Sequence, residues 1–585
     1  MFLTVFCTYS QNIFVDVNTL STVNNGSFTE PYSKIDNAIS FSNSNNVDTI
    51  FIASGDYLNS YDGPGNQNLN LSASNITIYG ENPSNTIVKL GGGVKFIELT
   101  GTNVSIENIQ IEGNTTNYQG AIHINNHSNL DSTRISIINS FFKNNTNDQA
   151  IGIGNGGGAI NAKNSTGKGI ILTVDKCQFL NNTLTGSMSG GSIYCGTNNH
   201  LNFTNNRVAC SGTAALSTMD GGIIGLNGAT ANIISSFISG GRSGRYGGGL
   251  YAISDIGDKE IIIRNSTFRD NQTSGNRGGA LFLDNNIDLT VINSEFSNNS
   301  CVGGFGNGGG VLAIYKSSGN SNANFINCTF ANNSGGSDYG ALNNQDGGTV
   351  NVMNCIFYGN TINGTNLSSG NHNCTDIGGN LFNNPLFTNS ANNDFTILAG
   401  SPAINSGISS FGIFNAPSTD LTGGPRNNPV DVGCFEFGNT RPNYNDECST
   451  FTIPCTDPGP PNGDTNQSFC LINNPTINDL SVNGISINWY DSISGGSVYS
   501  GTDLLINGNS YYSSQTIDSC ESINRFKVIV NLYETQDTID TQTACDNFTW
   551  MDGVTYTSTN NTATHILQSF NGCDSIITLD LTIHS

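Results

Sequence analysis

A seven-residue phrase, Asn-Ser-x-Phe-x-x-Asn, returns many times along this 585-residue chain. Clear copies begin at Asn139, Asn265, Asn293, Asn327 and Asn354, with Cys in place of Ser in the last two. Looser copies centre on Phe179, Val208 and Phe237, and an earlier one on Ile111. Successive copies are about thirty residues apart, a period that indicates a stack of similar supersecondary units.

A second signature, Gly-Gly followed by a small or aliphatic pair, precedes most copies, as in Gly157-Gly158-Ala159-Ile160 and Gly278-Gly279-Ala280-Leu281. Between the two signatures lie short alternating runs such as Leu289-Thr290-Val291-Ile292, which predict strands of three to five residues. One such unit cannot bury its apolar face alone, whereas stacking the units in register buries it continuously. The sequence therefore predicts an all-β solenoid of parallel strands.

The stacking explains the repeated residue types. The phenylalanines should form an inner aromatic column: Phe142, Phe179, Phe237, Phe268, Phe296, Phe330 and Phe357. Asparagines at fixed positions, among them Asn265, Asn293, Asn327 and Asn354, should form ladders in which each amide bonds the neighbouring coils. Glycine should provide positive φ at the corner before a strand.

These repeats resemble the right-handed parallel β-helix (pectin-lyase-like) family, and more narrowly the Gly-Gly-Ala-Ile and Phe-x-x-Asn repeats of polymorphic outer-membrane proteins. The resemblance covers residues 11–437. It implies that an amphipathic helix over residues 31–39, with Pro31 near its start, covers the first coil and protects its strand edges. At the far end, residues 401–407, 424–426 and 430–437 resemble the closing segment of such proteins.

The flanking segments differ in composition. Residues 1–10 are apolar and are interpreted as the remnant of a signal peptide, with an ordinary first strand as the alternative. Residues 438–463 contain five prolines and are predicted to be a linker, in which Cys448 and Cys455 could close a loop.

Two small β modules are predicted after the linker. Residues 464–532 resemble the immunoglobulin-like modules of secreted Bacteroidetes proteins, through Trp489-Tyr490-Asp491 and Gly495-Gly496. Residues 533–585 resemble a short adhesin repeat of the same bacteria. The resemblances imply two disulfides, one joining Cys470 to Cys520 and the other joining Cys545 to Cys573.

Three further cysteines, Cys177, Cys328 and Cys355, occupy the position that Ser holds in other copies of the phrase. We expect small buried side chains there. A disulfide between Cys328 and Cys355, on adjacent coils, is the alternative.

Charge and motifs exclude several classes of function. With 20 basic and 44 acidic residues the net charge is −24, which disfavours nucleic acid and anionic lipid as partners. No apolar run is long enough for a transmembrane helix. No dinucleotide, Walker or zinc motif is present, and we predict no cofactor; Asn- and Asp-rich turns could hold Ca²⁺, but no calcium motif supports it.

The nearest candidate for chemistry is a group of arginines, Arg242, Arg245, Arg264, Arg269 and Arg277, with Asp270 and Asp284 close in sequence. Arg245, Arg269 and Asp270 are the weak catalytic candidates, in a groove for an anionic glycan. The alternative is a set of solvated turn residues on neighbouring coils. Three isolated histidines, His123, His127 and His200, are expected at turns or on the surface rather than as bases.

The modular order of solenoid, linker and small β modules favours a secreted or cell-surface adhesin or display protein. Its expected partners are an extracellular glycan or a ligand on a host or neighbouring cell, and we expect a monomer. The alternative is a polysaccharide lyase or glycoside hydrolase acting on acidic glycans, since β-helices also host such enzymes.

Overall fold

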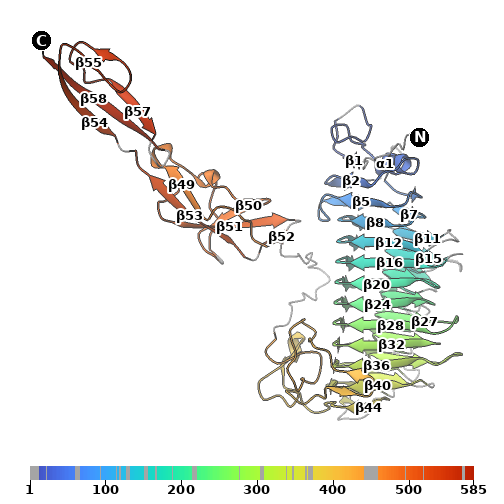
Figure 1. The fold of residues 1–585 in the computed structure, drawn as a ribbon. Coiled ribbons are helices and arrows are strands. Elements are labelled where there is room, and N and C mark those ends of the chain that lie inside the picture. Colours follow the sequence, from blue (N-terminus) through green and yellow to red (C-terminus); the bar gives the residue numbers. More distant parts are fainter. Residues whose placement is uncertain are drawn as a thin grey trace, which may run out of the picture. The chain divides into compact units, whose positions relative to one another are not determined.

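The computed structural model shows a chain that is almost entirely β (Figure 1). It describes residues 12–584, except for 21–22, 59–65, 92–93, 114, 117–119, 127–131, 150–155, 165–167, 187–188, 214–220, 276, 303–307, 337–338, 345–347, 363–364, 367–372, 440–458, 494–495, 518–519, 523, 536 and 569–572. The chain divides into two compact units, residues 1–453 and 454–585. The signal-peptide remnant at 1–10, most of the linker, and the Cys448 and Cys455 pair lie outside the described residues.

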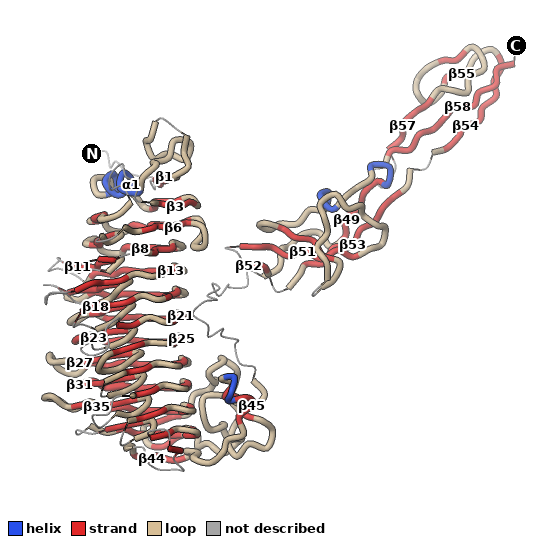
Figure 2. The backbone as a smooth tube through the Cα atoms, turned by 180° about the vertical axis from the view of Figure 1, so that it is seen from behind, coloured by secondary structure: helices blue, strands red, loops and turns tan. Residues whose placement is uncertain are grey.

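The first unit is a parallel β-solenoid, as predicted. Its strands form four long sheets within the described residues, and the largest has 13 strands, from β1 (Asn12–Val15) to β44 (Thr375–Gly378). We call this sheet 1; the 11-stranded sheet from β3 (Gly55–Tyr57) to β41 (Ile356–Tyr358) is sheet 2. The coils stack one above another, so that each strand pairs with its equivalents in the coils before and after it (Figure 2).

The inner aromatic column is present along much of sheet 2. Phe268 of β29 (Thr267–Arg269), Phe296 of β33 (Glu295–Ser297) and Phe330 of β37 (Thr329–Ala331) are aligned in register. Their ring centroids are 5.4 Å apart at each step, with nearly parallel planes, and Phe357 continues the stack 4.5 Å beyond Phe330. Phe142 and Phe179 form an earlier stacked pair at 5.0 Å. These rings lie inside one core that extends from Ile13 to Phe357.

Phe237 is an exception to the predicted column. In β25 (Phe237–Ser239) the residue that pairs with Phe268 is Ile238, while Phe237 pairs with Thr267. The matching phrase is therefore Ser235-Ser236-Phe237-Ile238, one residue out of step with our alignment. Because neighbouring side chains in a strand point to opposite faces, this shift places Phe237 on the outer face of sheet 2.

The asparagines of the phrase have two different roles. Asn265, Asn293, Asn327 and Asn354 have φ between 48° and 54°, so they form left-handed corners between sheets 1 and 2. One step of the predicted ladder is formed, since Nδ2 of Asn354 donates to Oδ1 of Asn327 at 3.2 Å. A longer buried ladder runs through the last asparagine of the phrase. In it, Nδ2 of Asn271 donates to Oδ1 of Asn299, Asn299 to Asn333, and Asn333 to Asn360, at 2.9–3.0 Å. Each amide also donates to a backbone carbonyl of the preceding coil, as Asn299 does to Phe268 O, so these buried polar groups are well satisfied.

Helix α1 (Ile35–Ser42) is present near the predicted place, four residues later than expected at its start. It buries Ile35, Ala38 and Ile39 in the main core at the first coils. At the other end, the predicted closing segment packs against the outside of late coils. There Nη2 of Arg426 donates to Oδ1 of Asn293, and Nη1 contacts Oε2 of Glu436 at 3.2 Å.

The second unit contains three small sheets within the described residues, and a disulfide links the two larger ones. One includes β49 (Asn466–Cys470), β53 (Phe526–Tyr533), β51 (Ser510–Ile517) and β50 (Ile487–Tyr490) in that order. The other orders β54 (Thr538–Cys545), β58 (Asp574–His584) and β57 (Thr564–Gln568). Both predicted disulfides are wrong, because Cys470 is bonded to Cys573 and Cys545 is a free, exposed thiol. Sequence spacing could not reveal a bond that crosses from one small sheet to the next.

The solenoid cysteines of the phrase are buried free thiols, as expected. Cys177, Cys328 and Cys355 are each fully buried. Their sulfur atoms contact the carbonyl two residues earlier, as the hydroxyl of Ser140 does at the same position of the repeat. The alternative Cys328–Cys355 disulfide is not formed.

Candidate functional site: an aromatic pocket

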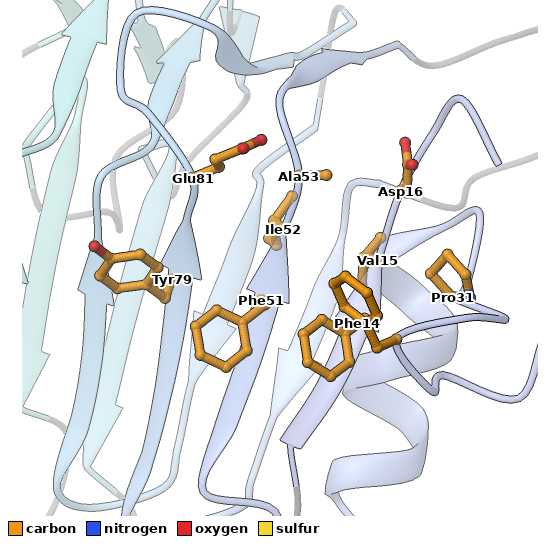
Figure 3. A pocket seen from close by; sticks show the side chains of 10 residues that line it. Phe14, Val15, Asp16, Pro31, Phe51, Ile52, Ala53, Tyr79 and Glu81 are labelled. Carbon is orange, nitrogen blue, oxygen red and sulfur yellow. The ribbon is translucent and has the colours of Figure 1, made fainter. Parts of the chain in front are cut away.

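A row of aromatic rings lies on the outer face of sheet 1, at its first three strands (Figure 3). Phe14 of β1, Phe51 of β2 (Thr49–Ile52) and Tyr79 of β5 (Ile76–Gly80) are aligned in register. The residues beside them in each strand, such as Ile50 and Ile78, point inward and are fully buried. Period-two alternation therefore places one aromatic ring per coil on the outside.

The rings are close enough to form one continuous surface. Phe14 and Phe51 are stacked with centroids 5.3 Å apart and planes 13° from parallel, and Tyr79 follows at 5.7 Å from Phe51 in an edge-on arrangement. Phe28, which is 78% exposed, meets Phe14 edge-on at 5.3 Å. Phe14, Phe51 and Tyr79 are each half-buried, and a contiguous aromatic patch of this kind on a surface is a candidate interaction site.

Two carboxylates flank the aromatic row on one side. Asp16, Ala53 and Glu81 each follow a ring residue by two positions, so they share its face of the sheet, and Figure 3 shows the small Ala53 between the two acids. The backbone N–H of Asn18 donates to Oδ1 of Asp16, and that of Ser54 donates to Oε2 of Glu81, both at 2.8 Å. These bonds hold the carboxylates in place at the rim.

The rings, the acids and Pro31 line an open hollow of about 290 Å³. This volume is close to the lower limit of about 300 Å³ for small-molecule pockets. Behind the wall, the buried Tyr57 hydroxyl donates to Ala53 O at 2.9 Å. Burial, helped by the charges of Asp16 and Glu81, raises the pKa of Tyr57, so the phenol remains protonated and supports the pocket backbone.

The arginines singled out in the sequence do not form one groove. Arg269 is 1% exposed; its Nη2 contacts Oε1 of Glu295 at 2.7 Å and its Nε donates to Oγ of Ser297. Its guanidinium also lies 5.4 Å from the ring centre of Phe237, so this residue is a buried structural partner and not an accessible base. Asp270 is a corner residue with φ of 53°, whose carbonyl accepts from Arg242.

Two of the remaining arginines are neighbours on adjacent coils, because the backbone N–H of Arg277 donates to the carbonyl of Arg245 at 3.3 Å. Arg245 lies over the ring of Tyr246 at 5.2 Å, and Arg277 lies over Tyr315 at 3.8 Å. Arg264 ends β28 (Lys259–Arg264) and is exposed on the outside of sheet 1. The five arginines therefore do not share one surface, because Arg269 is buried and Arg264 lies on the outside of sheet 1, but Arg245 and Arg277 lie together.

Two of the histidines have partners in the structure, and His127 lies outside the described residues. His123 is 4% exposed on β11 (Ile122–Asn126), in register with Glu98, which corrects the expectation of a turn or surface residue. Burial opposes ionisation of Glu98, yet its hydrogen bond with Lys95 holds the pKa of that carboxyl below its ordinary value. The ring nitrogens of His200 contact Thr230 and Asn202.

The aromatic pocket was missed in the sequence because its residues lie outside the repeated phrase. A signal was nevertheless present, since Phe14, Phe51 and Tyr79 each occupy the outward position of a short alternating run. Aligning those runs strand by strand would have placed the three rings side by side.

No protein-family model and no curated protein matches this chain. Within the described residues, no helix has both the length and the apolar character needed to cross a membrane. In the same part of the chain, no three His, Cys, Asp or Glu side chains converge as metal ligands would.

Proposed function

We propose that this chain is a secreted or cell-surface binding protein that recognises carbohydrate at the aromatic pocket. One observation carries the proposal: three aromatic rings in register on an exposed sheet, with two oriented carboxylates beside a hollow of one-sugar size. The C–H face of a pyranose packs on the negative face of an aromatic ring, and carboxylates accept hydrogen bonds from sugar hydroxyls.

The wider architecture supports display outside the cell. We propose a right-handed β-helix, since parallel crossover connections are right-handed in about 98% of cases. Helix α1 then acts as the cap of its first coil. The second unit is proposed to consist of an immunoglobulin-like module and an adhesin-type module of Bacteroidetes proteins. Its disulfide between Cys470 and Cys573 suits an oxidising compartment.

The binding experiment uses the full chain and a panel of neutral, basic and acidic oligosaccharides in titration calorimetry. We expect a member of the panel to bind, and Phe51→Ala to lower its affinity at least about tenfold, by removing the central ring. Phe411→Ala is the matched control, because Phe411 is an exposed aromatic residue, 55% accessible, away from the pocket. An equal loss of affinity in both variants, or the absence of binding to every oligosaccharide of the panel, contradicts the proposal.

The enzymatic alternative is tested on the same panel through the absorbance of unsaturated products and through new reducing ends. Turnover that is abolished by Arg245→Ala would favour a lyase. Turnover that survives this change but is lost with Phe51→Ala would make the pocket a substrate site.

A further inference from the structure

If the pocket binds carbohydrate as proposed, its own charge indicates which charge the bound carbohydrate should carry. Of the ten described residues that line it, two are acidic and none is basic. The whole chain carries a net charge of −24, so the surrounding field does not offset these acids. A uronate or sulfate group would meet two carboxylates without a cation to pair with.

Each carboxylate keeps one oxygen for a ligand. Asp16 uses Oδ1 to accept from Asn18, and Glu81 uses Oε2 to accept from Ser54. Within the described part of the chain, no donor is bonded to Oδ2 of Asp16 or to Oε1 of Glu81. Each backbone bond engages one oxygen of its carboxylate, and the second oxygen can accept a hydrogen bond from a ligand.

The aromatic rings favour a positive charge as well. The faces of Phe14, Phe51 and Tyr79 and the exposed ring of Phe28 carry the negative pole of the ring quadrupole. A cation that enters this hollow therefore meets four aromatic rings and two carboxylates. One strand, β2, lies between those that lead into Asp16 and Glu81, so two strand spacings of about 5 Å separate the two acids by about 10 Å, and Figure 3 shows Ala53 between them.

We propose that the pocket recognises an amino sugar through its protonated amine. The amine sits over Ala53, where the charges of Asp16 and Glu81 both attract it across the space between them, and the apolar face of the same sugar packs on Phe51 and its neighbours. The recognised chemistry is thus a glycan in which the amine is free rather than acetylated.

A matched pair of ligands tests this directly. Glucosamine oligomers and N-acetylglucosamine oligomers of equal length differ at the nitrogen of each sugar. In glucosamine this nitrogen is a protonated, positively charged amine, whereas in N-acetylglucosamine it is part of a neutral amide. We expect the full chain to bind the glucosamine oligomer at least about tenfold more tightly at low ionic strength, and the preference to shrink with added salt.

Charge-removing variants locate the effect. Asp16→Asn and Glu81→Gln keep the acceptor oxygen that the backbone uses, so each should lower glucosamine affinity about two- to fivefold and leave the acetylated ligand unaffected. Glu260→Gln, an exposed acid on a distant strand of sheet 1, is the control and should change neither affinity.

The outcomes separate this inference from the proposed function. Equal or tighter binding of the acetylated oligomer overturns the inference, while binding that still depends on Phe51 sustains the carbohydrate site. Binding of neither oligomer, nor of any other member of the panel, overturns both.

Discussion

The disulfide between Cys470 and Cys573 should limit how far the second unit can be stretched. It joins residues 103 positions apart, near the beginning of that unit and near its last strand. When tension is applied through the ends of the chain, the load passes along β49, across the disulfide and into β58. The partner strands β53 and β54 lie inside the closed loop and outside this path, so they carry no direct load while the disulfide is intact.

The expected magnitude follows from the size of the closed loop. At roughly 3.5 Å per extended residue, the 103-residue separation corresponds to about 36 nm of chain that tension cannot reach while the bond is intact. Closing a loop of this length also restricts the unfolded state, and the chain-entropy model assigns it about 4.7 kcal/mol. Measured values for native disulfides are commonly lower, so we expect a loss of 2–5 kcal/mol in the free energy of unfolding of the second unit.

The assay compares the unaltered full chain with the paired variant Cys470→Ser and Cys573→Ser in single-molecule stretching between its two ends. Cys545→Ser is the control, since Cys545 is an exposed free thiol in the same unit. The paired variant should reach a final contour length about 36 nm greater than the unaltered chain, and the control should match the unaltered chain. Equal final lengths for all three proteins would refute the closed loop and the load path.

Three other predictions concern the solenoid and the thiols. Asn299→Ala should lower the free energy of unfolding by about 1–3 kcal/mol in denaturant titrations, because it breaks the buried amide ladder on both sides. Arg269→Ala leaves the buried carboxylate of Glu295 without its ion-pair partner and should lower the free energy of unfolding by about 3–5 kcal/mol in the same measurement. Arg264→Ala, at an exposed position, should change it by no more than about 0.5 kcal/mol. Burial raises the pKa of Cys177 to about 12, so this thiol should remain protonated and resist iodoacetamide in the native protein at pH 8, while Cys545 is alkylated. Peptide mass mapping reads out the labels, and modification of both cysteines at equal rates would contradict the burial of the first.

The fold could be predicted because equivalent positions in successive coils of a solenoid recur at a nearly constant interval in the sequence. The positions of Phe268, Phe296 and Phe330 recur with the period of the coil, and the structure stacks these rings in one column. The error at Phe237 has the same origin, since a loosely matching phrase can be aligned one residue out of step and no other feature of the sequence corrects it. Pairing of Cys470 with Cys573 could not be predicted, because it depends on how two short sheets meet in space and not on any period.

The candidate site was hidden for a related physical reason. In a parallel coil, inward positions are constrained by the coils above and below, so their residue types repeat and reveal the fold. Outward positions carry no such constraint, and along the column that begins with Phe14, Phe51 and Tyr79 the next strands present Glu107 and Ile138 instead of further rings. Solubility alone requires polar residues at the outward positions of successive strands. A binding surface on a solenoid is therefore found where these positions hold other residue types. In this chain, aromatic rings occupy these positions in the first three strands of sheet 1, and two acids follow them at equivalent positions. Alignment of the strands reveals this arrangement, whereas the repeated phrase does not.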